Sequence, residues 1–440
     1  MSSLFRKCHI SLALWILSNR RDGRLMNSFL AVVIPKFFLS GAVITVICAF
    51  LLATTPRIAA AQDWTFRPDV SLAGVYNDNI RLRIEEGEQI DVKGGELDLR
   101  ARVARRSPTG SIVMIPQVVV ERYSSDADFD TEDFSFLFDS DHRSETSTWS
   151  FIARYSAEEV RSAEIADPDF DNPDIDRPIS DDSGLIQSEG RRFRFNVSPG
   201  VEFDLTPTSQ FSVVGNYTDS RFEEASDNLR DYTFGVLEFG FTHQLSERNS
   251  ISTTLYGNRY DTEQDQQTSN GYGVTAELTS KISEQRTLFV NAGYEQIETE
   301  FDVDGTQTER SDGVFLFGAG LTQEYEVSRL VVDLRHSVDA TGISTLVERS
   351  QARARFTRRL SPLLTAGVTA RVLTEEPVSE DIERDRDFAQ VRLDLSWRLN
   401  RRWSFVAEYS YTSQEFSGRA GNAAANAVRL GLRYAPPVRR

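Results

Sequence analysis

Histidine is the side chain that most often supplies acid–base chemistry near neutral pH, and this chain contains only four. His9 lies in the N-terminal stretch, His142 in a predicted turn, and His243 and His336 in separate predicted strands. The sequence contains no G-x-S-x-G or H-E-x-x-H motif and no cysteine-ligand pattern. We therefore expect no enzyme, no catalytic residue, no cofactor and no metal centre.

The densest group of potential cation ligands is the sequence DPDFDNPDID at 167–176. Alternating carboxylates could hold Ca²⁺, a hard cation that prefers oxygen ligands. The spacing does not match an EF-hand, because Asn172 stands where glycine is needed and Pro178 where a bidentate glutamate should be. We interpret 159–185 as a long acidic extracellular loop stiffened by proline. The alternatives are divalent-cation bridging to lipopolysaccharide and a loop folded over a pore mouth.

A further chemical signal comes from arginines at alternate positions in apolar–polar repeats. Arginine binds carboxylates in a bidentate way and keeps its charge, and basic side chains that line a pore select anions. The arginines that we expect to line a lumen are Arg67, Arg100, Arg102, Arg335, Arg353, Arg355, Arg371, Arg392, Arg398, Arg429 and Arg433, with Arg192 and Arg194 in a wider set. The equally weighted alternative is that the interleaved Asp69, Asp98, Asp333 and Asp394 neutralise them.

The middle of the chain supplies few cations at the equivalent positions. Its expected lumen residues are Ser212, Asn216, Ser252, Thr254, Asn258, Thr275, Thr279 and Asn291. Because the arginine-bearing segments at the two ends become neighbours if the sheet closes, we expect one arginine-lined wall and one hydroxyl and amide wall.

These residues must be positioned by strands, because apolar and polar residues alternate with a period of two after residue 62. The alternation is clear at 97–103, 193–205, 364–372 and 391–399. Successive side chains of a strand point to opposite faces, so each segment has one apolar and one polar face. Segments of about ten such residues separated by turns are typical of a membrane barrel.

The connections alternate between short and long, which is also typical of such barrels. Short polar turns are expected at 106–109, 206–209, 246–249, 283–286, 326–329, 361–363 and 400–402. Longer, mostly acidic connections are expected at 77–90, 124–130, 219–231, 261–270, 300–310, 339–346, 374–385 and 417–425. With strands placed at 132–139 and 146–158, the pattern predicts an all-β fold, a transmembrane antiparallel up-and-down β-barrel of about 18 strands with short turns in the periplasm.

Aromatic residues sort by strand end, as the interface girdles of a membrane barrel require. Trp64, Trp149, Trp397 and Trp403 fall beside the predicted short turns or at the start of the barrel. The tyrosines expected at the opposite end are Tyr76, Tyr123, Tyr155, Tyr217, Tyr232, Tyr260, Tyr272, Tyr294 and Tyr411.

The N-terminal 61 residues have the layout of a secretory signal peptide. Lys36 precedes the apolar stretch 37–53, and small residues at 59–61 predict cleavage after Ala61, with Met26 as a possible true start. An uncleaved membrane anchor is the alternative. Both cysteines, Cys8 and Cys48, precede residue 62, so the predicted mature chain, 62–440, has no thiol. The formal net charge of −17 argues against a nucleic-acid partner.

Two short motifs add to this pattern. The alternating segment 428–434, which ends in Tyr434, resembles the C-terminal signal recognised by barrel-assembly machinery. The sequence VYNDNIRL at 75–82, which follows the opening strand, resembles the start of the beta-barrel porin type 2 family. That resemblance implies an outer-membrane barrel associated with exopolysaccharide production and export, and it brings no catalytic residues.

We expect a bacterial outer-membrane pore that passes or exports an acidic exopolysaccharide. The alternatives are a general or anion-preferring porin for small solutes and a non-conducting structural or surface-binding protein. The expected partners are outer-membrane lipid, lipopolysaccharide, the barrel-assembly machinery, a polysaccharide and periplasmic export components.

Overall fold

The computed structural model describes residues 64–85, 87–124, 129–161, 190–223, 229–262, 267–303, 306–343, 345–378, 385–417 and 421–437. The chain divides into two compact units, Met1–Ala60 and Ala61–Arg440, and the second is the unit described below. The predicted signal peptide at 1–61 and the acidic motif at 167–176 lie outside the described residues.

No described residue belongs to a helix that is long and apolar enough to cross a membrane.

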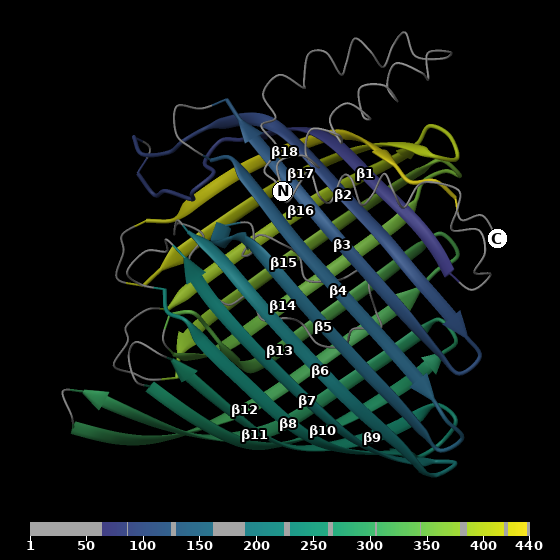
Figure 1. Ribbon diagram of the computed structural model, residues 1–440, viewed down its shortest axis with the longest axis vertical. Coiled ribbons are helices and arrows are strands. Elements are labelled where there is room, and N and C mark those ends of the chain that lie inside the picture. The colour runs from purple at the N-terminus through teal and green to yellow at the C-terminus, as the bar shows by residue number, and fades with distance from the viewer. Residues whose placement is uncertain are drawn as a thin grey trace, which may run out of the picture. The chain divides into compact units, whose positions relative to one another are not determined.

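The described chain forms an 18-stranded antiparallel sheet that closes on itself, because β1 pairs with both β2 and β18 (Figure 1). Every other strand pairs with its neighbours in sequence, so the connectivity is up-and-down. This confirms the predicted fold class. The strands are β1 (Trp64–Asn77), β2 (Val92–Ser107), β3 (Gly110–Tyr123), β4 (Thr131–Arg143), β5 (Ser147–Glu159), β6 (Arg191–Thr206), β7 (Ser209–Glu223), β8 (Tyr232–Gln244), β9 (Asn249–Thr262), β10 (Gln267–Ser283), β11 (Arg286–Val303), β12 (Thr306–Glu324), β13 (Ser328–Ala340), β14 (Leu346–Arg359), β15 (Leu364–Pro377), β16 (Arg386–Arg398), β17 (Trp403–Phe416) and β18 (Ala423–Tyr434).

The register of the ladders assigns each side chain to one of two faces. Large apolar residues such as Phe239, Phe315 and Leu393 stand exposed on one face of the sheet. The other face must be the interior, because its side chains meet strands that are not their neighbours: the Tyr260 hydroxyl on β9 donates to the carbonyl of Thr341, beyond β13. The exposed face therefore presents hydrocarbon outward, as a transmembrane barrel must.

The four tryptophans beside the short turns, Trp64, Trp149, Trp397 and Trp403, all stand exposed on the outward face. The predicted tyrosine girdle is partly wrong. Tyr123, Tyr232 and Tyr260 lie at inward positions, and the last two are almost completely buried. The outward members are Tyr76, Tyr155, Tyr217, Tyr272, Tyr294 and Tyr411.

The two strands predicted at 132–139 and 146–158 are both present, and the first of them is longer than predicted. β4 runs to Arg143 and β5 begins at Ser147, where the sequence predicted a strand ending at residue 139 and a turn near 140–145. The extension follows from pairing, since Ser140 and Asp141 register with Phe151 and Ser150 of β5. The connection between β4 and β5 is therefore a tight turn. The Ser144 amide closes this turn by donating to the Ser147 carbonyl at 2.8 Å.

One ladder is shorter than the strands that form it. β12 pairs with β13 only from Phe317 to Glu324, although β12 begins at Thr306. Residues 306–316 of β12 pair with β11 alone, so the β11–β12 hairpin, at the lower left of Figure 1, projects beyond its pairing with β13. On the other side, Ser337–Ala340 of β13 pairs only with β14. At the long-loop end of the described wall, β12 and β13 are therefore not paired with each other through their backbones. We call this part of the seam unzipped.

Candidate functional site: the barrel interior

The structure places the predicted arginines on the inward face. Arg353 registers with Arg371, and Arg355 with Thr369, which in turn faces Arg392. The other predicted arginines lie on β13 to β18, β1 and β2, which follow one another around the barrel. Their positions in the ladders put them on the same inward face. The inward arginines are Arg67, Arg100, Arg102, Arg335, Arg353, Arg355, Arg371, Arg392, Arg398, Arg429 and Arg433.

Several of these arginines contact carboxylates. Arg353 Nη2 lies 2.9 Å from Asp333 Oδ1, and Arg433 Nε lies 2.8 Å from Asp69 Oδ1. Asp69 and Asp333 were the expected partners. Asp98 instead accepts a hydrogen bond from the Gln117 amide at 3.1 Å. The alternative of neutralisation thus holds for part of the wall.

Two further partners were missed by the sequence reasoning. Arg429 Nε lies 3.0 Å from both carboxylate oxygens of Glu96, and Arg392 Nε lies 3.4 Å from Glu408. Glu96 lies two strands away from Arg429 around the closure of the sheet, so only the closed register brings them together. The alternation of side chains along β2 and β17 is enough to predict that both glutamates lie on the inward face.

The arginine wall changes along the barrel axis. Arg67 and Arg398 are exposed and lie toward the short-turn end, and Arg100 is exposed near the middle of β2. Arg371 is buried, and its guanidinium lies 5.6 Å from the centre of the Phe388 ring. The short-turn mouth therefore offers exposed cations, while Arg349 and Arg386, at the long-loop ends of β14 and β16, are enclosed.

A buried ionic cluster lies near the long-loop end of β14 to β16. The Glu375 carboxylate accepts from Arg349 Nε at 2.7 Å and from Arg386 Nη1 at 3.1 Å. Arg349 also contacts Asp339 at 3.2 Å, and Arg386 donates to Gln414 at 3.1 Å. Glu375 and both arginines are buried, so these charges are held by one another and form a fixed part of the inner wall.

We expect Glu375→Gln to lower the free energy of unfolding by about 1–3 kcal/mol, because it removes charge-assisted hydrogen bonds from two buried guanidinium groups. The remaining contacts of the two arginines keep the loss below that of an entirely unpaired charge. Urea unfolding from lipid vesicles measures the change. Glu376→Gln is the matched control, since Glu376 is the exposed neighbour on the outward face. Equal stability of the two variants would contradict the prediction.

A second ionic contact lies just beyond β5. Arg161 Nη2 lies 3.2 Å from Glu121 and 3.5 Å from Glu159. Burial by itself would lower the pKa of Arg161, but the carboxylates outweigh burial and raise that pKa above its usual range. The guanidinium is therefore charged at every physiological pH.

The wall formed by β6 to β12 has the predicted hydroxyl and amide character. Asn216 donates to Ser198 at 2.9 Å, and Asn196 donates to Asn216 at 3.0 Å. The predicted residues Ser212, Asn216, Ser252, Thr254, Asn258, Thr275, Thr279 and Asn291 all register on the inward face.

This second wall also carries carboxylates, which the sequence reasoning did not include. Glu295 accepts from the Tyr256 hydroxyl at 2.8 Å and from Asn258 at 2.6 Å, and Glu238 and Glu277 occupy inward positions nearby. Strands nine places apart lie opposite each other in an 18-stranded barrel, so these acids face the arginine wall. The interior is therefore polarised across its width.

The connection between β1 and β2 folds into the interior at the long-loop end. Leu82 is buried against Leu373 and Phe388, which are inward residues of β15 and β16, and against Ala423 and Ala425 of β18. Its φ of 48° is in the left-handed region, which is unfavourable for a leucine. Burial of the side chain compensates for this backbone conformation.

The VYNDNIRL sequence at 75–82 pins this connection to the last strand. The Asp78 carboxylate accepts from the backbone and the side chain of Asn426, at 2.7 and 2.8 Å. The Asn79 amide donates to the carbonyls of Arg83, at 2.8 Å, and Ala424, at 3.0 Å. The motif thus has a structural task, which is to direct the first connection inward across the closure of the barrel.

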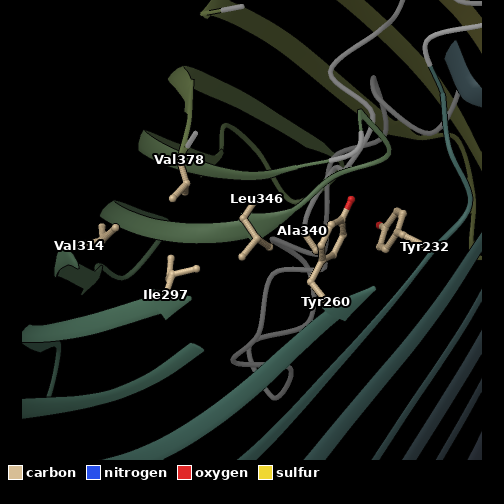
Figure 2. Packing of buried hydrophobic residues seen from close by; sticks show 7 residues of the cluster. All are labelled: Tyr232, Tyr260, Ile297, Val314, Ala340, Leu346 and Val378. Atoms are coloured by element: carbon tan, nitrogen blue, oxygen red, sulfur yellow. The ribbon is translucent and has the colours of Figure 1, made fainter. Parts of the chain in front are cut away.

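The tip of the β13–β14 hairpin, which comprises the described residues 340–343, 345 and 346, also lies inside the barrel. Ala340 and Leu346 are buried in a cluster with Ile297, Val314 and Tyr260, as Figure 2 shows. The remaining members of this cluster are Tyr232 and Val378. Apolar residues thus gather on the inward face at the long-loop end, where the alternation of the strands calls for polar ones.

The two strand histidines are satisfied by neighbouring serines. His243 Nδ1 lies 2.9 Å from the Ser209 hydroxyl, and His336 Nδ1 lies 2.8 Å from the Ser350 hydroxyl. They belong to β8 and β13 and do not meet. Within the part of the chain that the structure describes, no group of histidine, cysteine, aspartate and glutamate side chains could hold a metal ion.

No family model and no curated protein matches this chain. Among solved structures, Pseudomonas aeruginosa OpdQ is 10% identical with a TM-score of 0.43, covering 85% of this chain and 98% of that one. The FrpB iron transporter from Neisseria meningitidis (F3-3 variant) is 10% identical with a TM-score of 0.40, covering 86% and 82%. The unliganded ferric citrate transporter FecA is 13% identical with a TM-score of 0.43, covering 82% and 61%. The activity of this barrel has to be inferred from its own residues.

Proposed function

We propose that this protein is a bacterial outer-membrane channel for anionic solutes, with acidic polysaccharide as the substrate class. The observation that carries the proposal is the arginine wall, which runs on the inward face from β13 through β18 to β2. Rings or rows of basic side chains lower the electrostatic barrier for anions in a pore. The exposed hydrocarbon outside supports a membrane location.

The polarised interior fits a carboxylated sugar. Guanidinium groups bind carboxylates in a bidentate way, and the hydroxyl and amide groups of the opposite wall can exchange hydrogen bonds with sugar hydroxyls. Exposed arginines at the short-turn mouth would meet an anionic chain first if it entered from the periplasm. The resemblance of 75–82 to an exopolysaccharide-associated family points to the same substrate class.

A second candidate is an anion-preferring porin for small solutes. It is favoured by the two inward segments at the long-loop end, the β1–β2 connection and the β13–β14 tip, which occupy space that a polymer would need. Both candidates share the prediction of anion selectivity and differ in the size of the permeant molecule.

The test is the reversal potential of the purified mature chain in planar bilayers under a KCl gradient. We expect a steady current whose reversal potential has the sign of chloride selectivity. Cation selectivity would overturn the anionic substrate class, and complete silence of a folded barrel would favour a non-conducting surface protein.

The substrate class is tested in the same bilayers by current block. Oligogalacturonate, which carries one carboxylate per sugar, should block the current at lower concentration than maltooligosaccharide of equal length. We expect the block to be stronger from the short-turn side, where the exposed arginines lie. Equal block by the neutral and the acidic oligomer would remove the support for acidic polysaccharide and leave the small-solute porin.

A further inference from the structure

The seam between β12 and β13 joins two strand edges that could pair but do not. The existing ladder ends at Phe317 opposite His336. Continuing that register would place Leu316 opposite Ser337, Val314 opposite Asp339, and Asp312 opposite Thr341. Beyond the ladder, both edges lack a partner in the sheet pairing that the structure describes. Unpaired strand edges are costly and are usually covered or paired.

The tip of β13–β14 does not lie against this edge of β12 and packs inside the barrel. The Tyr260 hydroxyl donates to the Thr341 carbonyl at 2.8 Å, and the Arg230 amide donates to the Gly342 carbonyl at 2.8 Å. A β-carbon on Gly342 would lie only 2.7 Å from the Phe222 ring, so the backbone of the tip approaches β7 closely. β7 and β9 are well separated from β13 around the barrel, so the tip reaches them through the interior.

The apolar side chains of the tip suit a second position, in the wall of the barrel. Val338, Ala340 and Leu346 have the parity of the outward face, where the barrel carries apolar residues against lipid. In the structure Ala340 and Leu346 instead bury those surfaces against Ile297 and Val314, which are inward residues of β11 and β12 (Figure 2). The same apolar side chains would therefore be covered in either position, by lipid if the seam is zipped or by the inner wall if the tip is folded in.

The receiving surface explains the misplaced tyrosines. Tyr232 and Tyr260 are inward and almost fully buried, and their rings contact each other at a tilt of 38° with centres 5.5 Å apart. Ile343 extends the contact further, packing beside Val160, Leu229 and Phe416 from other parts of the wall. An apolar inner patch that contradicts the alternation is what a docking place for the tip requires.

We propose that the β13–β14 tip is a hinged gate with two positions, folded into the lumen as in this structure or zipped into the wall against residues 312–316 of β12. The folded-in position narrows the long-loop end, and the zipped position widens it. The consequence for transport rests on the proposed channel function, whereas the two positions themselves do not. Interfaces of packed side chains switch between discrete arrangements, which suits a gate.

Paired cysteines in a Cys8→Ser, Cys48→Ser background test the two positions separately. Ile297→Cys with Leu346→Cys should cross-link the folded-in tip, and Asp312→Cys with Thr341→Cys should cross-link the zipped one. Ala319→Cys with Leu334→Cys, a pair already in register in the existing ladder, is the positive control. Cross-linking in lipid vesicles is scored by non-reducing electrophoresis after oxidation with copper phenanthroline.

We expect all three pairs to cross-link. The 297–346 disulfide should lower single-channel conductance at least about twofold, with recovery in dithiothreitol, and the 312–341 disulfide should abolish closures. Failure of the 312–341 pair to cross-link while the control pair does would overturn the zipped position. An unchanged conductance in the fully cross-linked 297–346 variant would overturn the gate. If both pairs cross-link but no variant conducts, the channel proposal fails while the two positions stand.

Tyr260→Phe supplies a test that does not depend on engineered cysteines. It removes the hydrogen bond to Thr341 and keeps the ring, so it should favour the zipped position. We expect the ratio of open to closed dwell times to rise about two- to tenfold, which is the effect of losing one buried hydrogen bond. Tyr256→Phe, whose hydroxyl contacts Glu295 and not the tip, is the matched control. An equal ratio of open to closed dwell times in the two variants would contradict the tip as the moving element.

Discussion

Leu255→Arg is expected to destabilise the barrel by about 2–4 kcal/mol, whereas Thr254→Arg, one residue earlier on β9, should cost less than about 1 kcal/mol. Leu255 is 57% exposed and outward, near the middle of its strand, so its side chain faces the hydrocarbon of the bilayer. A guanidinium there loses its hydration without gaining a partner. Thr254 registers with Gly240 and Thr275 on the inward face, where a charged side chain can reach water.

The measurement is reversible urea unfolding from lipid vesicles, with tryptophan fluorescence as the signal. Leu393→Arg on β16 should repeat the loss, because Leu393 is also exposed and outward. Ser396→Arg on the same strand serves as its inward counterpart, because Ser396 is half-buried and registers with Thr365 and Val406 on the inward face. If the outward and inward substitutions cost the same, the assignment of the two faces would be wrong, and with it the description of the arginines as lumen residues.

The period of two was enough to predict the fold and the two faces of the strands, although Tyr123, Tyr232 and Tyr260 were assigned to the outer girdle and lie inward. It works because the side chains of a strand alternate rigidly between lipid and lumen, and a slip by one residue would reverse every one of them. The positions of Arg353, Arg371 and Arg392 on one face follow from this alternation alone. The short–long order of the connections then set the strand count without any tertiary information.

The partners of those arginines could not be predicted in the same way. Arg429 and Glu96 are separated by 333 residues in sequence and meet only because β18 closes on β1 and β2. Alternation fixes the face of a side chain but not how far each strand is displaced along its neighbour. The inward fold of the β13–β14 tip is likewise a tertiary choice between two apolar environments. Its one sequence signal was the parity of Tyr232 and Tyr260, which matches that of the lumen residues Thr254 and Asn258.

Replacing Arg335, Arg353 and Arg355 together by glutamine should lower the ratio of anion to cation permeability by about tenfold or more at low salt. Two unit charges about 7 Å apart in water interact by about 0.6 kcal/mol, close to RT, so each arginine near the path contributes about two- to threefold. The three effects multiply, and Arg353→Gln also leaves Asp333 without its ion-pair partner. Raising the salt should shrink the difference, because the screening length falls to about 8 Å at physiological ionic strength.

The matched control is Arg259→Gln, which removes the same charge from the outward face near the long-loop end, where Arg259 is exposed beside Asp261. The reversal potential in a KCl gradient should be unchanged by this control and should move toward the cation side in the triple variant. Because the control removes one charge and the triple variant removes three, a control shift about one third as large as that of the triple variant would mean that selectivity follows the overall charge of the protein. Selectivity that changes only with the inward residues requires ions to pass along the arginine wall, since a screened charge acts over little more than its own neighbourhood.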